Sequence, residues 1–276
     1  MTDTNDIIYF MSEQKRKTVG LALGSGADKG LAHIGVIKTL LKNNIPIDYI
    51  SGASIGAVVA AYYALFLEVD SLEQVFKDNT KSIPLNIFNL GLKNSIFTNK
   101  KFYNLMRYNL FSGLSFEDTM IPLRIPATNL DDGKKVVFKE GKILDAVLPS
   151  ISIPGVFPVV KNGNRHLVDG GLVDAVPVDL LEEFKPDIVI AVDLYHYQLE
   201  PKENYNMNDV LTRTYKIYIS NLTKICLNED GKNCVILRPQ MKEKLASIDF
   251  KNMDEKINSG IIETEKNIEK IKELLK

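Results

Sequence analysis

The chain has 276 residues and a mass of 31.0 kDa, and its 34 basic and 35 acidic side chains leave a formal net charge of −1. Its hydrophobic content of 45% and charged content of 25% are typical of a globular protein and exclude a disordered chain. The balanced charge argues against a nucleic-acid partner. Two cysteines, Cys226 and Cys234, are too few for a disulfide framework and lack companion metal ligands.

The N-terminal residues carry acidic side chains where a secretory signal peptide needs basic ones. Residues 49–67 contain no charged side chain and are long enough to span a bilayer. However, acidic residues flank this segment and two glycines interrupt its first part. We interpret it as a buried strand, a tight turn and a buried helix, and we expect a cytoplasmic protein that can lie peripherally on a membrane.

Strand-like and helix-like patterns alternate along the chain, as in a parallel sheet covered by helices on both faces. In chain order we expect a strand at 18–23, a helix at 31–41, a strand at 48–53, a helix at 54–67, strands at 122–129, 135–139 and 186–194, a long helix at 209–227, a strand at 234–238 and a long helix at 254–275. The predicted fold class is α/β, a three-layer α/β/α arrangement with a mainly parallel central sheet.

The two long helices each carry an apolar stripe at helical spacing. The stripes are Leu211, Tyr215, Tyr218 and Leu222 in the first helix, and Ile257, Ile261, Ile268, Ile271 and Leu275 in the second. We interpret both as core contacts. The alternative for the last helix, a zipper that binds a partner, has weak support because Gly260 interrupts the pattern.

The sequence contains no internal repeat and no linker rich in proline, glycine or serine. We therefore expect a single domain at 18–276 after an N-terminal extension at 1–17. Within this domain, residues 71–120 form the least regular stretch and are expected to be a cap or flap, and residues 207–276 supply the C-terminal helices.

Gly52-Ala53-Ser54-Ile55-Gly56 has the pattern G-x-S-x-G between a predicted strand and a predicted helix. The bare pattern occurs by chance in about one chain of this length in ten, so the context matters more than the letters. A nucleophilic serine needs a sharp strand-to-helix turn, flanking glycines and a nearby helix N-terminus. Ser54 fits that role. The alternative is that Ser54 only caps the helix.

A glycine-rich loop, residues 24–30, follows the first predicted strand and opens the next helix. It fails both common nucleotide-binding patterns, because Lys29 stands where a third glycine is required and Lys29-Gly30 reverses the Walker order. An oxyanion hole needs only two converging backbone donors, which Gly26 and Ala27 can supply. A third motif, Asp169-Gly170-Gly171, is on its own more often a turn than a catalytic group.

Together these motifs resemble those of bacterial patatin-like phospholipases. The resemblance is carried by residues 21–35, 52–56 and 169–171, with 176–179 behind them, and it covers roughly residues 18–194 well and the C-terminal helices more loosely. It implies a catalytic dyad without histidine, in which Ser54 is the nucleophile and Asp169 the base. It also implies an oxyanion hole at Gly26 and Ala27, supported by Gly24, Ser25, Lys29, Gly30, Gly52, Gly56, Gly170 and Gly171.

The same resemblance implies a lipid or acyl-ester substrate and no metal or organic cofactor. The sequence departs from the family where Ser25 and Ala27 replace the usual glycines and where Asp28 adds an acid beside Lys29. Neither the lipid that is cleaved nor the oligomeric state follows from the sequence.

Two other functions stay open. A Ser-His-Asp esterase or thioesterase would use His196 with Asp193 or Asp169, in the chain order of α/β-hydrolases. A catalytically weakened lipid-binding module would follow if the altered loop had lost its function. On the substrate side, apolar residues with scattered lysines between 71 and 120 suit an acyl pocket and an anionic lipid surface, or simply the packing of a cap.

Overall fold

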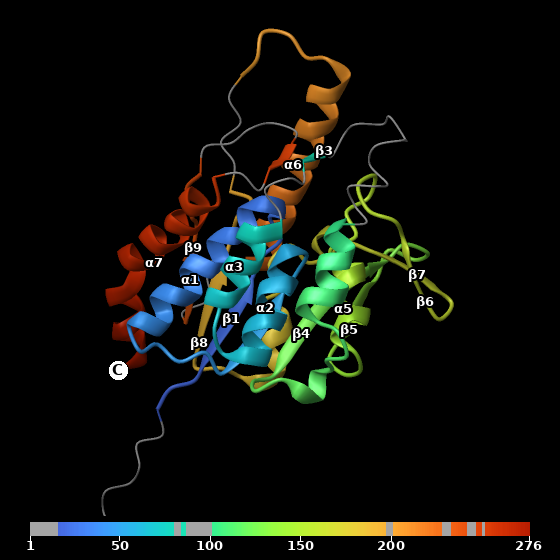
Figure 1. The fold of residues 1–276 in the computed structure, drawn as a ribbon. Coiled ribbons are helices and arrows are strands. Elements are labelled where there is room, and N and C mark those ends of the chain that lie inside the picture. Colours follow the sequence, from blue (N-terminus) through green and yellow to red (C-terminus); the bar gives the residue numbers. More distant parts are fainter. Residues whose placement is uncertain are drawn as a thin grey trace, which may run out of the picture.

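The computed structural model describes residues 16–79, 84–86, 101–196, 201–227, 233–241, 247–249 and 252–276. A sheet of eight strands runs through the molecule (Figure 1). Its order is β6 (Val160–Asn162), β7 (Arg165–Val168), β4 (Leu123–Asn129), β2 (Tyr49–Gly52), β1 (Val19–Leu23), β8 (Ile188–Val192) and β9 (Cys234–Leu237), with β5 (Lys135–Phe138) also paired to β4. The pairs from β4 to β9 are parallel, and the β4–β5, β4–β7 and β7–β6 pairs are antiparallel.

The α-helices are α1 (Leu31–Lys42), α2 (Ile55–Phe66), α3 (Asp70–Asn79), α5 (Ile143–Ser150), α6 (Met207–Leu227) and α7 (Met253–Leu275). Short 3₁₀ helices span Ala27–Gly30, Phe116–Asp118, Gly170–Leu172 and Asp179–Phe184, and a π-helix spans Leu105–Leu110. A separate antiparallel pair joins β3 (Pro84–Asn86) to β10 (Ser247–Asp249).

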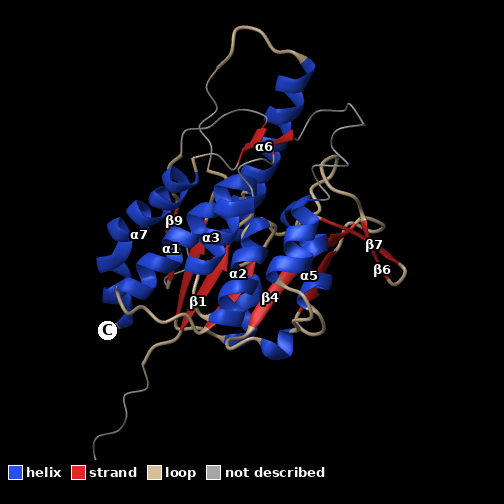
Figure 2. Ribbon diagram, viewed as in Figure 1, coloured by secondary structure: helices blue, strands red, loops and turns tan. Residues whose placement is uncertain are grey.

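Alternate residues of the central strand β1 face two different cores, because successive side chains of a strand point to opposite faces. Leu21 and Leu23 lie in the larger core, together with residues of α1, α2, α5 and α7. Ala22 lies in a smaller core with Leu181 and with Leu227 at the end of α6. Figure 2 shows the first set of helices in front of the strands, and the end of α6 packs on the opposite face, where Leu227 lies in the core with Ala22. The predicted three-layer fold with a mainly parallel sheet is confirmed.

Helices α1 and α7 approach each other so closely that their backbones touch. A Cβ on Gly35 would lie 2.0 Å from the carbonyl oxygen of Ile257, and a Cβ on Gly260 would lie 2.0 Å from that of Ala32. Each helix therefore needs a glycine at the crossing. Gly260 does not interrupt the apolar stripe of α7. It is the residue that lets α7 pack against α1 as part of the core.

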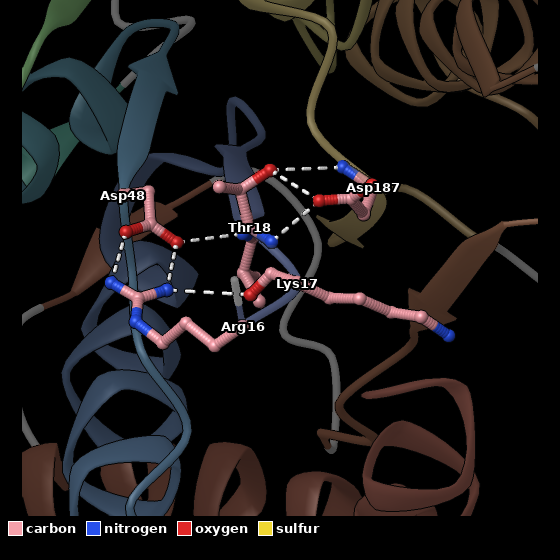
Figure 3. A network of polar contacts seen from close by, with 6 residues as sticks. Arg16, Lys17, Thr18, Asp48 and Asp187 are labelled. Carbon is pink, nitrogen blue, oxygen red and sulfur yellow. Dashed lines mark hydrogen bonds and ion pairs between the residues drawn. The ribbon is translucent and has the colours of Figure 1, made fainter. Parts of the chain in front are cut away.

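A network of polar contacts holds the beginning of β1 between its two neighbours (Figure 3). The Arg16 guanidinium binds both carboxylate oxygens of Asp48, just before β2, at 2.8 and 2.5 Å. Thr18 donates its N–H and its hydroxyl to Asp187, just before β8, at 2.8 and 2.9 Å. Burial acts to raise the pKa of Asp48, but the bonds from Arg16 and from the Val19 N–H outweigh it, so the pKa lies below its ordinary value.

Each of the ten predicted helices and strands has a counterpart that begins and ends within a few residues of the expected bounds. Helices α3 and α5 and the β6–β7 hairpin were not predicted. The stripe predicted for α6 is partly wrong: Ile219 and Thr223 are buried, whereas Leu211 and Tyr218 are exposed. The helix is rotated relative to the prediction because its buried side meets Ala175 and Tyr195.

The predicted cap at 71–120 lies partly outside the described residues, including most of its apolar side chains between 83 and 97. Where it is described, seven of its apolar side chains are at most 4% exposed and belong to the larger core: Leu72, Phe76, Phe102, Leu105, Met106, Leu110 and Phe111. For these residues, packing is the interpretation that the structure supports.

Candidate active site

Ser54 stands at the turn between β2 and α2 in a strained backbone conformation. Its φ is 55° and its ψ −126°, a region that residues with side chains rarely adopt. The backbone approaches itself closely in this turn. A Cβ on Gly52 would lie 2.3 Å from the carbonyl oxygen of Gly56, and a Cβ on Gly56 would lie 2.3 Å from that of Leu23. The flanking glycines are therefore required by close backbone approach, and Ser54 projects from a rigid corner.

Ser54 is 4% exposed, and two polar groups bind it. Its Oγ donates a hydrogen bond of 2.6 Å to Oδ2 of Asp169. Its backbone N–H donates to Oγ of Ser150, the last residue of α5, at 3.0 Å. This N–H is one of the groups that a helix start leaves without an intrahelical partner, and Ser150 satisfies it. Ser54 is not a helix cap by its own side chain, because no capping hydrogen bond from that side chain is present.

Asp169 lies between β7 and the 3₁₀ helix Gly170–Leu172 and is held from several sides. Its Oδ1 accepts the N–H of Gly171 at 2.8 Å, which leaves Oδ2 for Ser54. The Asp169 N–H donates to the carbonyl oxygen of Ser152 at 3.0 Å, and the Thr128 hydroxyl donates to the Asp169 carbonyl oxygen at 2.7 Å. Both the backbone and the carboxylate of Asp169 are thus fixed in orientation.

Burial raises the pKa of Asp169 from 3.8 to about 7, although the hydrogen bonds from Ser54 and Gly171 act in the opposite direction. The side chain is 4% exposed, so its ionised form loses most of its hydration. A carboxyl group with such a pKa can both accept and return a proton near neutral pH.

The glycine-rich loop offers free backbone donors next to this pair. The N–H groups of Gly24 and Ser25 are occupied, by the carbonyl oxygens of Val192 at 3.1 Å and Ala175 at 2.8 Å. Those of Gly26 and Ala27 have no hydrogen-bond partner among the residues that the structure describes. Ala27 has a φ of 50°, in the left-handed region that favours glycine, so the loop forms with a non-glycine residue at this position.

Close packing explains the other glycines of the predicted site. A Cβ on Gly24 would lie 2.6 Å from the Val192 carbonyl oxygen, and one on Gly30 would lie 2.2 Å from the Ile55 side chain. A Cβ on Gly170 would lie 2.2 Å from the Pro126 carbonyl oxygen. These three glycines allow the glycine-rich loop, helix α2 and the Asp169 turn to pack closely against their neighbours.

Ser25 lies against the Asp169 turn. Its Oγ is buried without a hydrogen-bond partner in the described structure, and a Cβ on Gly171 would lie 2.2 Å from it. The serine that replaces a family glycine therefore fits because Gly171 has no side chain.

The two charged residues of the loop are directed to other parts of the molecule. Asp28 forms an ion pair of 2.6 Å with Lys256 on α7. The Lys29 ammonium lies 3.4 Å from the Leu194 carbonyl oxygen and 5.9 Å from the centre of the Tyr195 ring. The acid that the sequence adds beside Lys29 thus connects the loop to α7.

The hydrogen-bond partners of the three histidines do not include Ser54 or Asp169 in the described structure. His196 contacts the backbone oxygen of Asp193 at 3.3 Å and the Gln240 amide at 2.7 Å. His166 contacts Asp131 on the surface. His33 is fully buried and donates from Nε2 to the Gly24 carbonyl oxygen at 2.8 Å, and burial lowers its pKa to about 4, so that the ring is neutral.

Several residues that surround the pair were not predicted from the sequence. Ser150 and Ser152 lie at and just after the end of α5, a helix that was not predicted, and Thr128 lies on β4. The Tyr103 hydroxyl is 2.6 Å from the Ser152 hydroxyl and so joins the segment before the π-helix to the Asp169 turn. A lone serine, threonine or tyrosine carries no local signal of such a role.

Among the described residues, no three histidine, cysteine, aspartate or glutamate side chains gather as they would around a metal ion. No helix in this part of the chain has the length and apolar character needed to cross a membrane.

Comparison with known proteins gives matches in sequence and in fold. A family model described as patatin-like phospholipase matches residues 21–182. The lysophospholipase NTE1 of Pyricularia oryzae is 26% identical over 271 residues, which cover 88% of this chain and 18% of that protein. The lysophospholipase NTE1 of Kluyveromyces lactis is 31% identical over 194 residues, which cover 69% of this chain and 13% of that protein. The chain therefore spans less than a fifth of the length of either relative.

Among solved structures, the crystal structure of VipD from Legionella pneumophila superimposes with a TM-score of 0.52 at 13% sequence identity. The alignment covers 93% of this chain and 67% of VipD, and it shows a likeness in fold. The family model spans more than half of the chain and includes all three motifs around the Ser54–Asp169 pair. The chain belongs to the patatin-like phospholipase family.

Proposed function

We propose that the protein is a serine acyl hydrolase that cleaves carboxylic esters of lipids, with Ser54 as the nucleophile and Asp169 as the base. The observation that carries this proposal is the 2.6 Å hydrogen bond from Ser54 Oγ to Asp169 Oδ2, between two side chains that are each 4% exposed. A serine hydroxyl becomes a useful nucleophile when a positioned base accepts its proton.

The reaction proceeds in two halves. Ser54 Oγ attacks the ester carbonyl carbon while its proton passes to Asp169, and the resulting oxyanion accepts hydrogen bonds from the N–H groups of Gly26 and Ala27. The protonated Asp169 then returns the proton to the leaving alcohol oxygen, and the acyl group stays on Ser54. A water molecule next attacks the acyl carbon and gives its proton to Asp169, which passes it to Ser54 Oγ as the fatty acid leaves.

The pKa of about 7 supports this role for Asp169. A stronger acid would be ionised at neutral pH but would be a poor proton acceptor, and a weaker acid would be mostly protonated before the reaction. With this value, about half of the molecules carry the ionised base at pH 7.

The Ser-His-Asp alternative has little support from the contacts of His196. Both recorded contacts of its ring go to Asp193 and Gln240, and the Asp193 carboxylate accepts bonds from the Tyr195 N–H and from Arg238. The weakened-module alternative has little support from the loop, because the N–H groups of Gly26 and Ala27 have no partner among the described residues despite the substitutions.

The names of the curated relatives suggest lysophospholipids as the first substrates to test. The purified protein is incubated with a mixed lipid extract, and the products are identified by mass spectrometry. We expect free fatty acid and a deacylated headgroup product, both absent when the Ser54→Ala variant replaces the wild type.

Labelling with a fluorophosphonate probe tests the two residues directly. We expect the wild type and His196→Ala to be labelled at Ser54, Ser54→Ala to be unlabelled, and Asp169→Asn to be labelled at least a hundredfold more slowly. Rapid labelling of Asp169→Asn together with loss of labelling in His196→Ala would assign the base to the histidine instead. Lipid binding without any labelling would support the weakened module.

A further inference from the structure

Helix α6 carries two apolar faces, and within the part of the chain that the structure describes only one of them is covered. The inner face, with Ile219 and the half-buried Tyr215 and Leu222, packs against Ala175 and Tyr195. The outer face consists of side chains that are between 43% and 78% exposed: Met207, Val210, Leu211, Ile217, Tyr218 and Ile225. Single exposed apolar side chains are ordinary, but a row of six on one helix is typical of a surface that binds another protein or a membrane.

The six side chains of the outer face lie on one side of the helix. At about 100° per residue, they fall within an arc of roughly 120°, and residues 207 and 225 point in nearly the same direction. From Met207 to Ile225 the row is about 27 Å long at 1.5 Å per residue. This is the shape of an amphipathic helix that lies flat on a surface.

The charges around this face favour an anionic partner. Residues 201–227 contain four basic and two acidic side chains, although the whole chain has a net charge of −1. One of the acids, Asp209, is paired with Lys202 at 2.6 Å. By helical position, Arg213 and Lys224 lie along the edge of the outer face next to Ile217. An apolar face with basic residues beside it is typical of helices that bind anionic lipid surfaces.

The outer face is joined to the candidate active site. The Tyr218 hydroxyl donates a hydrogen bond of 2.6 Å to the carbonyl oxygen of Leu172, in the turn that follows Asp169. On the inner face, burial raises the pKa of Tyr215 and the negative charge of Asp169 adds to the shift. In Figure 1 the first turns of α6 stand beyond the carboxyl ends of β1, β2 and β8. Ser54 follows the carboxyl end of β2 and so lies at the same end of the sheet.

We propose that the outer face of α6 docks the protein on an anionic lipid surface and so presents the Ser54–Asp169 pair to its substrate. The inference rests on the proposed function, which makes an aggregated lipid the substrate. It places the lipid contact on residues 207–225, whereas the sequence favoured the region 71–120.

The test measures cosedimentation with vesicles and hydrolysis of 4-nitrophenyl butyrate, a soluble ester, side by side. The vesicles are phosphatidylcholine alone or phosphatidylcholine with phosphatidylserine at a ratio of 7 to 3. The outer-face variant is Met207→Glu/Leu211→Glu. The matched control is Leu130→Glu/Val159→Glu, which places the same two charges on exposed apolar residues elsewhere. A third variant, Arg213→Gln/Lys224→Gln, removes basic charge alone.

We expect the wild type to bind the anionic vesicles at least tenfold more tightly than the neutral ones. Relative to the wild type, the affinity of the outer-face variant for anionic vesicles falls at least tenfold more than its rate on the soluble ester does. The reason is that two apolar side chains no longer enter the lipid. The control variant binds like the wild type. The third variant loses most of the preference for anionic vesicles.

Several results overturn the proposal: equal vesicle binding by the outer-face variant and the wild type, equal losses in the outer-face and control variants, or no vesicle binding by the wild type. A fourth is the finding, by light scattering, that the wild type is a dimer and the outer-face variant a monomer that still binds vesicles. The outer face would then join two copies of the chain. Vesicle binding through α6 without hydrolysis of any ester would contradict the proposed function alone.

Discussion

Replacing Asp169 with asparagine tests the energetic basis of the candidate site. Asparagine has nearly the same size and keeps a carbonyl oxygen for the Gly171 N–H, but it carries no charge and accepts no proton at neutral pH. Burial raises the pKa of Asp169 from 3.8 to about 7. A shift of about 3 units corresponds to roughly 4 kcal/mol by which the ionised carboxylate destabilises the folded state.

The sign of this effect fixes its pH dependence. Because the folded pKa is raised, the folded state binds the proton more tightly than the unfolded state does, and the wild type loses stability as the pH rises from about 4 to 7. Asp169→Asn does not lose this stability. Its advantage over the wild type in free energy of unfolding is expected to grow by about 2 to 3 kcal/mol between pH 5 and pH 8.

The measurement is urea unfolding at both pH values, followed by far-UV circular dichroism because the chain has no tryptophan. Comparing two pH values removes every effect of the substitution that does not depend on pH. Asp132→Asn, at an exposed site in a turn, is the matched control and is expected to show no such growth. An advantage that stays constant or shrinks between pH 5 and pH 8 would refute the argument from burial.

The substitution that raises the stability should lower the catalytic activity. The wild-type rate on a soluble ester is expected to rise with pH through about 7, as Asp169 becomes ionised. The Asp169→Asn variant should be slower by a factor of about 10² to 10⁴ at every pH. A more stable and less active variant is the expected result for a residue that is kept at a site for its chemistry.

Three other substitutions test the packing and polar contacts that support the site. Gly260→Ala puts a Cβ 2.0 Å from a carbonyl oxygen of α1 and should lower the free energy of unfolding by about 1 to 3 kcal/mol; an unchanged urea midpoint would contradict the close crossing. Lys135→Met removes the cation 2.9 Å from the buried Asp174, whose pKa burial and a neighbouring acid raise to about 7. The substitution should lower the free energy of unfolding by about 2 kcal/mol, a moderate value because the lysine is partly exposed. This decrease should be larger at pH 8 than at pH 5 in the same unfolding assay. Ser150→Ala leaves the buried N–H of Ser54 without its acceptor, which should cost about 1 to 3 kcal/mol and slow fluorophosphonate labelling; equal labelling rates would show that Ser150 does not position the turn.

Periodicity and motif context predicted most of the fold. Strands such as β1 and β8, buried on both faces, appear in the sequence as short continuous apolar runs, and α1 and α2 as apolar spacings of three and four. The hairpin β6–β7 was missed because its strands are short and four of their seven residues are exposed. Helix α5 was missed because it is short and carries Pro149 near its end.

The face that a helix buries is harder to predict than the helix itself. The sequence of α6 has apolar residues on more than one side, so periodicity alone permits several buried stripes, and contact with Ala175 and Tyr195 selects one. For α7 the misleading residue was Gly260, which weakens a zipper pattern but is what a close crossing with α1 requires. Such choices depend on a partner that is distant in sequence.

The same distinction holds for the candidate site. Ser54, Asp169 and the glycine-rich loop were found because each belongs to a motif, and their roles stay a prediction until the variants are measured. Ser150 belongs to no motif and is connected to the turn only by the fold. The division of residues 1–276 into an extension, one domain and a cap also stays a prediction.

The neighbours of β1 and α1 have a consequence for how the protein is synthesised. Strand β1 pairs with β8, which follows it by more than 150 residues, and α1 crosses α7, the last described helix. Domains can begin to fold while the ribosome is still extending the chain, but a contact forms only after both of its partners have left the exit tunnel. The glycine-rich loop lies between β1 and α1, and Asp28 of this loop binds Lys256 on α7. The nascent chain can therefore form the Ser54 turn early, yet it completes the support of the glycine-rich loop only after residues 253–276 have emerged.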